Sequence, residues 1–236
     1  MKLLAAIVAC LVGHAGLVAQ DTDPGQADDT FVTKELCGFE VRLVNGFGGH
    51  ALHDEVMRLL EDQLYRITRV APEPALGKLR KVPIWIGHED PRHAAKCMFY
   101  HPNPRWLADN DYPTRLAGGV EVANARNFLR WTLDQPWMVL HELAHAYHHQ
   151  VLGYGNADIR AAFGAAKKEG LYQKVLRIGG TEEKHYALTN EQEYFAEATE
   201  AYFGTNDFYP FVRSELRRYD PRCHAMLEKV WGKRRQ

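Results

Sequence analysis

The sequence predicts an α+β fold with a small mixed sheet and a mostly helical C-terminal half. The first observation is a pair of strand-like runs, Phe39–Val44 and 82–86, which are rich in β-branched and apolar residues. The second is the segment His53–Val70 between them, whose apolar residues recur at helical spacing. The third is a series of helical patterns over 157–168, 190–203 and 209–218. The length of the chain suits one domain over residues 31–236.

Two more segments lie between the sheet-forming part and the helical half. Residues 98–107 are aromatic and are interrupted by Pro102 and Pro104, which is typical of an ordered loop that lines a cleft. Residues 118–123 predict another strand. A helix follows, with Asp134 as its candidate N-cap and Pro136 in its first turn, and it is expected to end near Gly153.

This helix carries His141, Glu142 and His145. Two histidines four residues apart lie on one face of a helix and can bind one zinc ion. Catalytic zinc takes three protein ligands and leaves one position for water, whose pKa it lowers toward about 7. A neighbouring glutamate can then remove the proton of that water, so the pattern predicts hydrolytic zinc chemistry. The alternative is a hydrogen-bonded pair of core histidines that binds no metal.

A third ligand is expected on the helix over 190–203. Thr189 and Gln192 match a capping box, and Gly204 is a natural stop. Glu193 and Glu197 then share a face of this helix. Glu193 suits a zinc ligand, and Glu197 suits a residue that accepts the second ring N–H of a ligating histidine. The alternative is a solvated acidic stripe, although most of the circumference of this helix is apolar.

These two segments resemble a known family. Residues 138–149 and 185–203 are similar to the signatures of the anthrax lethal factor catalytic-domain family, a branch of the gluzincin zinc peptidases that includes the Pro-Pro endopeptidases. The resemblance implies a zincin-like metallopeptidase domain with His141, His145 and Glu193 as ligands of one zinc ion. It also implies Glu142 as general base and general acid, with Glu197 beside the ligands. The preference for particular substrates does not transfer.

Tyr186 is the remaining candidate catalytic residue. The resemblance implies that its hydroxyl stabilises the oxyanion. A peptidase needs a donor at the carbonyl oxygen, and a phenol seven residues before Glu193 can reach the open position of the metal. The alternative is a packing tyrosine with a hydrogen-bonded hydroxyl.

The expected function is that of a zinc-dependent metallopeptidase, with an endopeptidase favoured, which hydrolyses peptide bonds by Glu142-assisted attack of a zinc-bound water. Its partner is a peptide or protein substrate, whose backbone the strand over 118–123 would pair with as a sheet edge, unless a loop covers that strand. A formal net charge of −1 argues against nucleic acid as the partner. Alternatives are a zinc hydrolase that acts on a non-peptide amide of the cell envelope, a zinc-binding pseudo-peptidase without turnover, and a protein that binds no metal.

The beginning of the chain predicts export. Lys2 precedes an apolar run over residues 3–12, and small residues follow, so residues 1–20 are expected to be a signal peptide and residues 21–30 a flexible leader. The mature protein would be secreted, periplasmic or extracellular, without stable membrane insertion. Cys37, Cys97 and Cys223 would remain. One disulfide, Cys37 with Cys97, is expected in an oxidising compartment, and the alternative is three buried thiols.

Overall fold

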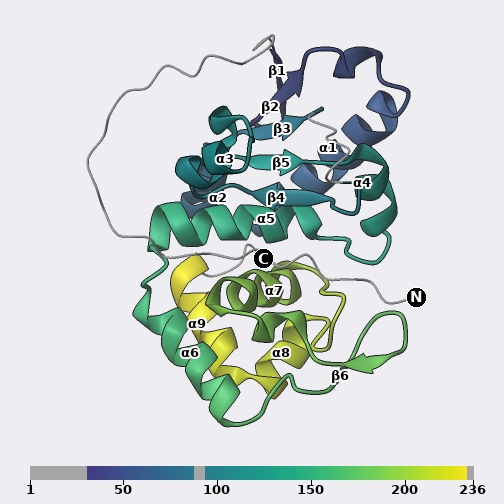
Figure 1. Cartoon of the computed structure of the whole chain (residues 1–236). Helices are drawn as coiled ribbons and strands as arrows, with labels where there is room; N and C mark the ends of the chain where they lie inside the picture. The colour runs from purple at the N-terminus through teal and green to yellow at the C-terminus, as the bar shows by residue number, and fades with distance from the viewer. Residues whose placement is uncertain (1–30, 88–93, 233–236) are drawn as a thin grey trace.

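The structure is a computed structural model that describes residues 31–87 and 94–232, and within these ranges it is a mixed α+β protein with a small mixed sheet (Figure 1). The coarse fold class predicted from the sequence is therefore confirmed. The signal peptide and leader predicted over residues 1–30 lie outside the described residues. None of the described helices is long and apolar enough to cross a lipid bilayer.

Five strands form the main sheet in the order β1-β2-β3-β5-β4. Their bounds are β1 Phe31–Leu36, β2 Phe39–Val44, β3 Ile84–Ile86, β4 Met98–Tyr100 and β5 Val120–Val122. The three inner strands run parallel, and the two outer strands run antiparallel to their neighbours. The predicted strand at Phe39–Val44 is confirmed, and the strand predicted over 82–86 is shorter by two residues.

The expected sheet edge is wrong. The strand predicted over 118–123 exists as β5, but it lies between β3 and β4 and is hydrogen-bonded on both sides. The edge strand next to β5 is β4, which arises within the segment predicted as a loop. Pro102 lies two residues after the end of β4, and a proline limits sheet pairing because it has no backbone N–H to donate. Only three residues therefore carry the strand pattern.

Helices cover both faces of the sheet, as parallel strands require. On one face, α1 (His53–Val70) contributes Val56, Leu60, Leu64 and Ile67, which recur at helical spacing and are all buried. The other face holds a smaller apolar cluster, which consists of Trp85, Leu107 and Leu116. The remaining elements of this half are η1 Phe47–Gly49, α2 Glu73–Leu79, α3 Pro104–Asp109, η3 Thr114–Leu116 and α4 Ala125–Trp131.

The second half of the chain is mostly helical. Its elements are α5 Met138–Tyr147, the π-helix η4 His148–Leu152, α6 Ala157–Lys168, the hairpin strands β6 Val175–Leu176 and β7 Glu182–Glu183, η5 Tyr186–Leu188, α7 Glu191–Phe203, α8 Arg213–Tyr219 and α9 Pro221–Trp231. Figure 1 shows α5 alongside the sheet and α7 below it among the C-terminal helices. These two helices pack against each other. The helix predicted over 157–168 is confirmed, whereas the one predicted over 209–218 begins at Arg213, after Pro210.

The expected disulfide between Cys37 and Cys97 is absent, and all three described cysteines are free thiols. Cys97 is buried with its Sγ 3.1 Å from Met138 Sδ, while the Sγ of Cys37 lies near the backbone of α1. Burial raises the pKa of both thiols, so neither is a reactive thiolate.

Candidate metal centre

Helix α5 holds the histidine pair in place through its buried residues. Val139, Leu143 and Ala146 are inaccessible to solvent and anchor the helix, while His141, Glu142 and His145 are partly exposed on another face. The helix begins at Met138 with Trp137 at its N-cap, and no side chain caps it. The predicted start at Asp134 is therefore wrong. The helical path continues beyond Tyr147 as a π-helix to Leu152, which agrees with the expected end near Gly153.

Helix α7 brings glutamates to the same place. Its N-cap is Asn190, whose side chain accepts the backbone N–H of Glu193 at 2.8 Å, so the capping box predicted at Thr189 is wrong. Glu193 is 5% exposed, and Glu197 and Glu200 are each 1% exposed. These carboxylates are buried against α5, which rules out the solvated acidic stripe.

Three donor atoms from the two helices converge on one point. His141 Nε2 and His145 Nε2 are 3.1 Å apart, and Glu193 Oε2 lies 3.2 Å from the first and 3.3 Å from the second. A tetrahedral ion with bonds of about 2.0–2.1 Å separates its ligand atoms by about 3.3 Å. The triangle therefore has the dimensions of a zinc coordination face.

The electrostatics of this triangle call for a positive charge. Burial disfavours the charged form of Glu193, but the two histidines outweigh it and hold the pKa of this carboxyl below its usual range. Burial likewise opposes protonation of His141, yet its hydrogen bonds to Glu193 and Glu200 raise the pKa of this histidine well above its ordinary value. The triangle therefore favours a bound positive charge, which a metal cation can supply.

The residue that orients His141 is Glu200. Its Oε1 lies 2.8 Å from His141 Nδ1, whereas the nearest oxygen of Glu197 is 3.6 Å away. The role predicted for Glu197 therefore passes to a residue that the sequence reasoning missed. A signal was present, because Glu193, Glu197 and Glu200 recur at the i, i+4, i+7 spacing of one helix face.

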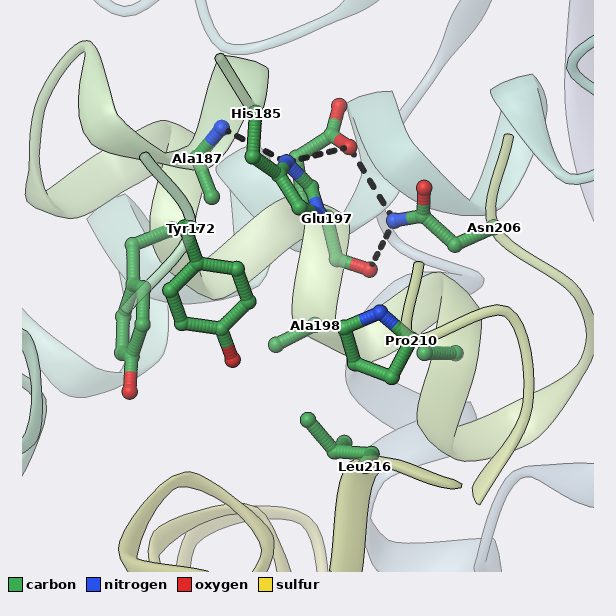
Figure 2. A pocket seen from close by; sticks show the side chains of 10 residues that line it. Tyr172, His185, Ala187, Glu197, Ala198, Asn206, Pro210 and Leu216 are labelled. Carbon is green, nitrogen blue, oxygen red and sulfur yellow. Dashed lines mark hydrogen bonds and ion pairs between the residues drawn. The ribbon is translucent and has the colours of Figure 1, made fainter. Parts of the chain in front are cut away.

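Glu197 is held elsewhere. Asn206 Nδ2 donates to Glu197 Oε2 at 3.0 Å and to the backbone oxygen of Glu197 at 2.7 Å, and His185 Nδ1 lies 3.7 Å from Glu197 Oε2. These residues line a small cavity of about 10 Å³. Figure 2 shows how their side chains lie around it. Burial, with Asp207 and Glu200 nearby, raises the pKa of Glu197. Glu197 therefore supports the loop after α7.

An open cleft of about 460 Å³ lies over the triangle. Glu142 and Tyr186 line it together with the three donors, so the structure brings all the predicted catalytic and ligand residues to one place. Tyr186 is the first residue of η5, and its burial beside Glu193 raises the pKa of its hydroxyl, which therefore remains a neutral donor. Further lining residues come from β4 and from the β6–β7 hairpin.

Comparisons of the chain with protein-family models, with curated proteins and with solved structures found no match. The chemistry of the site therefore follows from its own geometry and sequence. Among the described residues, two groups bring three potential donors within 4.8 Å of one another: His141, His145 and Glu193, and His141, Glu197 and Glu200.

The first of these groups is the better metal site. In the second group, His141 Nδ1 and Glu200 Oε1 are 2.8 Å apart, which is a hydrogen-bond distance and is shorter than the about 3.3 Å between two ligands of a tetrahedral ion. In the first group, His141 Nε2, His145 Nε2 and Glu193 Oε2 lie at the spacing of ligand atoms, and all three residues line the cleft. The second group supports the first, because Glu200 fixes the tautomer of His141 that presents Nε2.

Proposed function

We propose that this protein is a zinc metallopeptidase of the gluzincin type with a zincin-like domain. The observation that carries the proposal is a carboxylate, Glu142, beside three donors at tetrahedral spacing in one cleft. The resemblance of residues 138–149 and 185–203 to the lethal factor catalytic-domain family supports the same assignment. His141, His145 and Glu193 would hold the ion, which supplies a polarised water and a Lewis acid for the scissile carbonyl.

The residues of the chain then divide the reaction between them. Glu142 takes the proton of the attacking water and delivers it to the departing amine. Tyr186 donates its hydroxyl hydrogen to the carbonyl oxygen as negative charge develops there. Glu200 keeps the ring of His141 in the orientation that presents Nε2. Since water is the nucleophile, no covalent link to the protein forms.

The outer edge of β4 is suited to an extended peptide. Cys97 O accepts from Ala123 N and His101 N donates to Gly119 O, so alternate residues bond to β5 while the backbone groups of Met98 and Tyr100 face outward. Tyr100 N–H donates to Glu142. The N–H and C=O groups of Met98 and the C=O group of Tyr100 then remain for pairing with the substrate backbone. The cleft extends past both ends of the strand, since it is lined by Lys96 before the strand and by Pro102 after it. This extent favours binding of an internal segment of a peptide substrate over binding of its terminus.

The place of action that we propose is outside the cytoplasm, after removal of residues 1–20. An apolar run behind Lys2 supports this part of the proposal. Purification of the secreted form and sequencing of its first residues would test it directly. A chain that retains Met1 after secretion would contradict it.

The decisive experiment combines zinc analysis with cleavage of a diverse peptide library. We expect one zinc ion per chain and cleavage by the natural protein. Glu142→Gln should keep the zinc and lose cleavage by several orders of magnitude, and Tyr186→Phe should keep the zinc and lose about 10²–10³-fold in kcat. Zinc without cleavage would replace the peptide by a non-peptide amide substrate or indicate a pseudo-peptidase. Absence of zinc would overturn the site.

A further inference from the structure

A π-helix follows the catalytic helix directly. Residues His148–Leu152 form a wider turn between α5 and Gly153. Such turns are rare, are energetically unfavourable and occur often at functional sites, because the extra residue changes the direction of the side chains that follow. In this protein the turn directs His149 and Gln150 toward Tyr100, the last residue of the edge strand β4.

The Tyr100 hydroxyl is fixed from two directions. Gln150 Nε2 donates to it at 3.0 Å, and the hydroxyl lies 2.7 Å from His149 Nδ1. The hydroxyl therefore accepts from Gln150 and forms a second hydrogen bond with the ring of His149. Gln150 also donates to Gly118 O at 2.8 Å, just before β5, so the turn is joined to two strands. Tyr100 is 6% exposed, and burial raises its pKa to about 12, so the hydroxyl keeps its hydrogen at neutral pH.

The backbone of the same tyrosine reaches the catalytic carboxylate. Tyr100 N–H donates to Glu142 Oε2 at 2.8 Å. One oxygen of Glu142 is thereby held at the edge of the sheet, and Oε1 remains for proton transfer. Tyr100 thus connects the π-helix to Glu142. Its hydroxyl is hydrogen-bonded to the π-helix, and its backbone N–H is hydrogen-bonded to Glu142.

We propose that Tyr100, His149 and Gln150 are positioning residues for Glu142, which set the height and direction of its carboxylate over the metal centre. The inference rests on the proposed function, since it assigns Glu142 a task that requires an accurate position. None of the three residues belongs to the set His141, His145 and Glu193, so their loss alters proton transfer rather than metal binding. A misplacement of about 1 Å can cost a factor of about 10² in rate.

The kinetic test replaces the hydroxyl. Tyr100→Phe should lower kcat by about tenfold or more, with KM and zinc content unchanged. His149→Leu and Gln150→Leu should act in the same direction. Tyr147→Phe is the matched control, because it removes a phenol from the same helical path whose hydroxyl donates to Val230 O instead, and its kcat should equal that of the natural protein. A parallel fall of kcat in the control, or a normal kcat in Tyr100→Phe, would overturn the inference.

A double-mutant cycle separates positioning from general loss of structure. If Tyr100 acts through Glu142, then Tyr100→Phe should produce no further loss in a Glu142→Gln protein, whereas a merely structural effect would add to the first. The residual rate of Glu142→Gln must be measurable for this comparison, so a substrate chosen from the library for rapid cleavage is used. Additive losses would contradict the inference.

A second readout does not depend on activity. The amide hydrogen of residue 100 should exchange slowly in the metal-free protein, because it is bonded to Glu142. We expect exchange to accelerate by about tenfold or more in Tyr100→Phe and in Glu142→Ala, and to stay unchanged in Tyr147→Phe. If the natural protein cleaves no peptide, this measurement still decides the inference. Unchanged exchange in both Tyr100→Phe and Glu142→Ala would overturn it, whereas acceleration in both would support the positioning even though the proposed function fails.

Discussion

At the scale of single residues, the two buried carboxylates next to the candidate metal centre make different contacts. Glu200 accepts from His141 at 2.8 Å, whereas Glu197 is bonded to Asn206. We therefore expect Glu200→Leu to weaken zinc binding by about 10–100-fold, because His141 loses the partner that fixes its tautomer. Glu197→Leu should weaken it less. Competition with a chelating dye of known affinity measures both, and a larger effect at Glu197 would show that the assignment is reversed.

His148 is buried among aromatic rings, and its unpaired ring nitrogens lower the stability of the fold. It is inaccessible to solvent, its ring meets those of Tyr154 and Phe195, and neither ring nitrogen has a hydrogen-bond partner in the described part of the chain. Burial, with His145 and His149 nearby, lowers its pKa to about 4. We expect His148→Phe to raise the free energy of unfolding at pH 7 by about 1–3 kcal/mol, because the ring contacts remain and the unpaired nitrogens are removed.

The same histidine makes stability depend on pH. The unfolded chain binds this proton below about pH 6.5, and the native protein only below about pH 4. The contribution of His148 to the free energy of unfolding is therefore at its maximum above about pH 6.5. It falls as the pH decreases, by on the order of 3 kcal/mol at pH 4. Urea unfolding of the metal-free protein between pH 8 and 4 measures the loss, and His148→Phe should reduce it. An equal slope in the natural protein and the variant would contradict the prediction.

At the scale of elements, one glycine governs how α7 meets α5. Gly204 follows the last residue of α7, and a Cβ at this position would lie 1.9 Å from Cε2 of Trp137, the N-cap of α5. Gly204→Ala should therefore cost about 3 kcal/mol or more, since the bulky ring cannot yield without moving the start of α5. Gly164→Ala is the matched control in the interior of α6, where a Cβ meets no neighbour, and should stabilise by about 0.5–1 kcal/mol. Thermal unfolding of both variants tests the pair.

The elements also explain which parts of the structure the sequence predicts. Helix His53–Val70 and helix 157–168 were predicted to the residue, because each carries a long apolar face that is set by local spacing. Strand β4 was missed, because three residues are too few to establish a period. The place of β5 inside the sheet was predicted wrongly, since strand order is decided by contacts distant in sequence.

The candidate site was more predictable than the sheet. His141, Glu142 and His145 are fixed relative to one another by a single helix, so their spacing alone determines a shared face. Glu193 lies on a second helix. The mostly apolar circumference of that helix indicates that the helix is buried. The exchange of roles between Glu197 and Glu200 depends on the packing angle of α5 against α7 and on the capture of Glu197 by Asn206, which no local pattern encodes.

At the scale of the whole molecule, the candidate metal centre lies between the two halves of the chain. His141 and His145 belong to α5, which lies along the sheet, and Glu193 belongs to α7 among the C-terminal helices (Figure 1). A bound ion would link these helices directly and would be absent from the unfolded chain. Metal binding should therefore act as a contribution to folding stability.

We accordingly expect zinc to raise the free energy of unfolding by about 4 kcal/mol when free zinc is a thousandfold above its Kd. Differential scanning calorimetry of the metal-free and zinc-loaded protein measures this as a rise in Tm. Glu142→Gln should show the full rise, because it retains all three donors, whereas Glu193→Gln should lose most of it. A rise that persists in Glu193→Gln would place the ion outside the interface between α5 and α7, because the only donor that α7 contributes to the triangle would then be dispensable for binding.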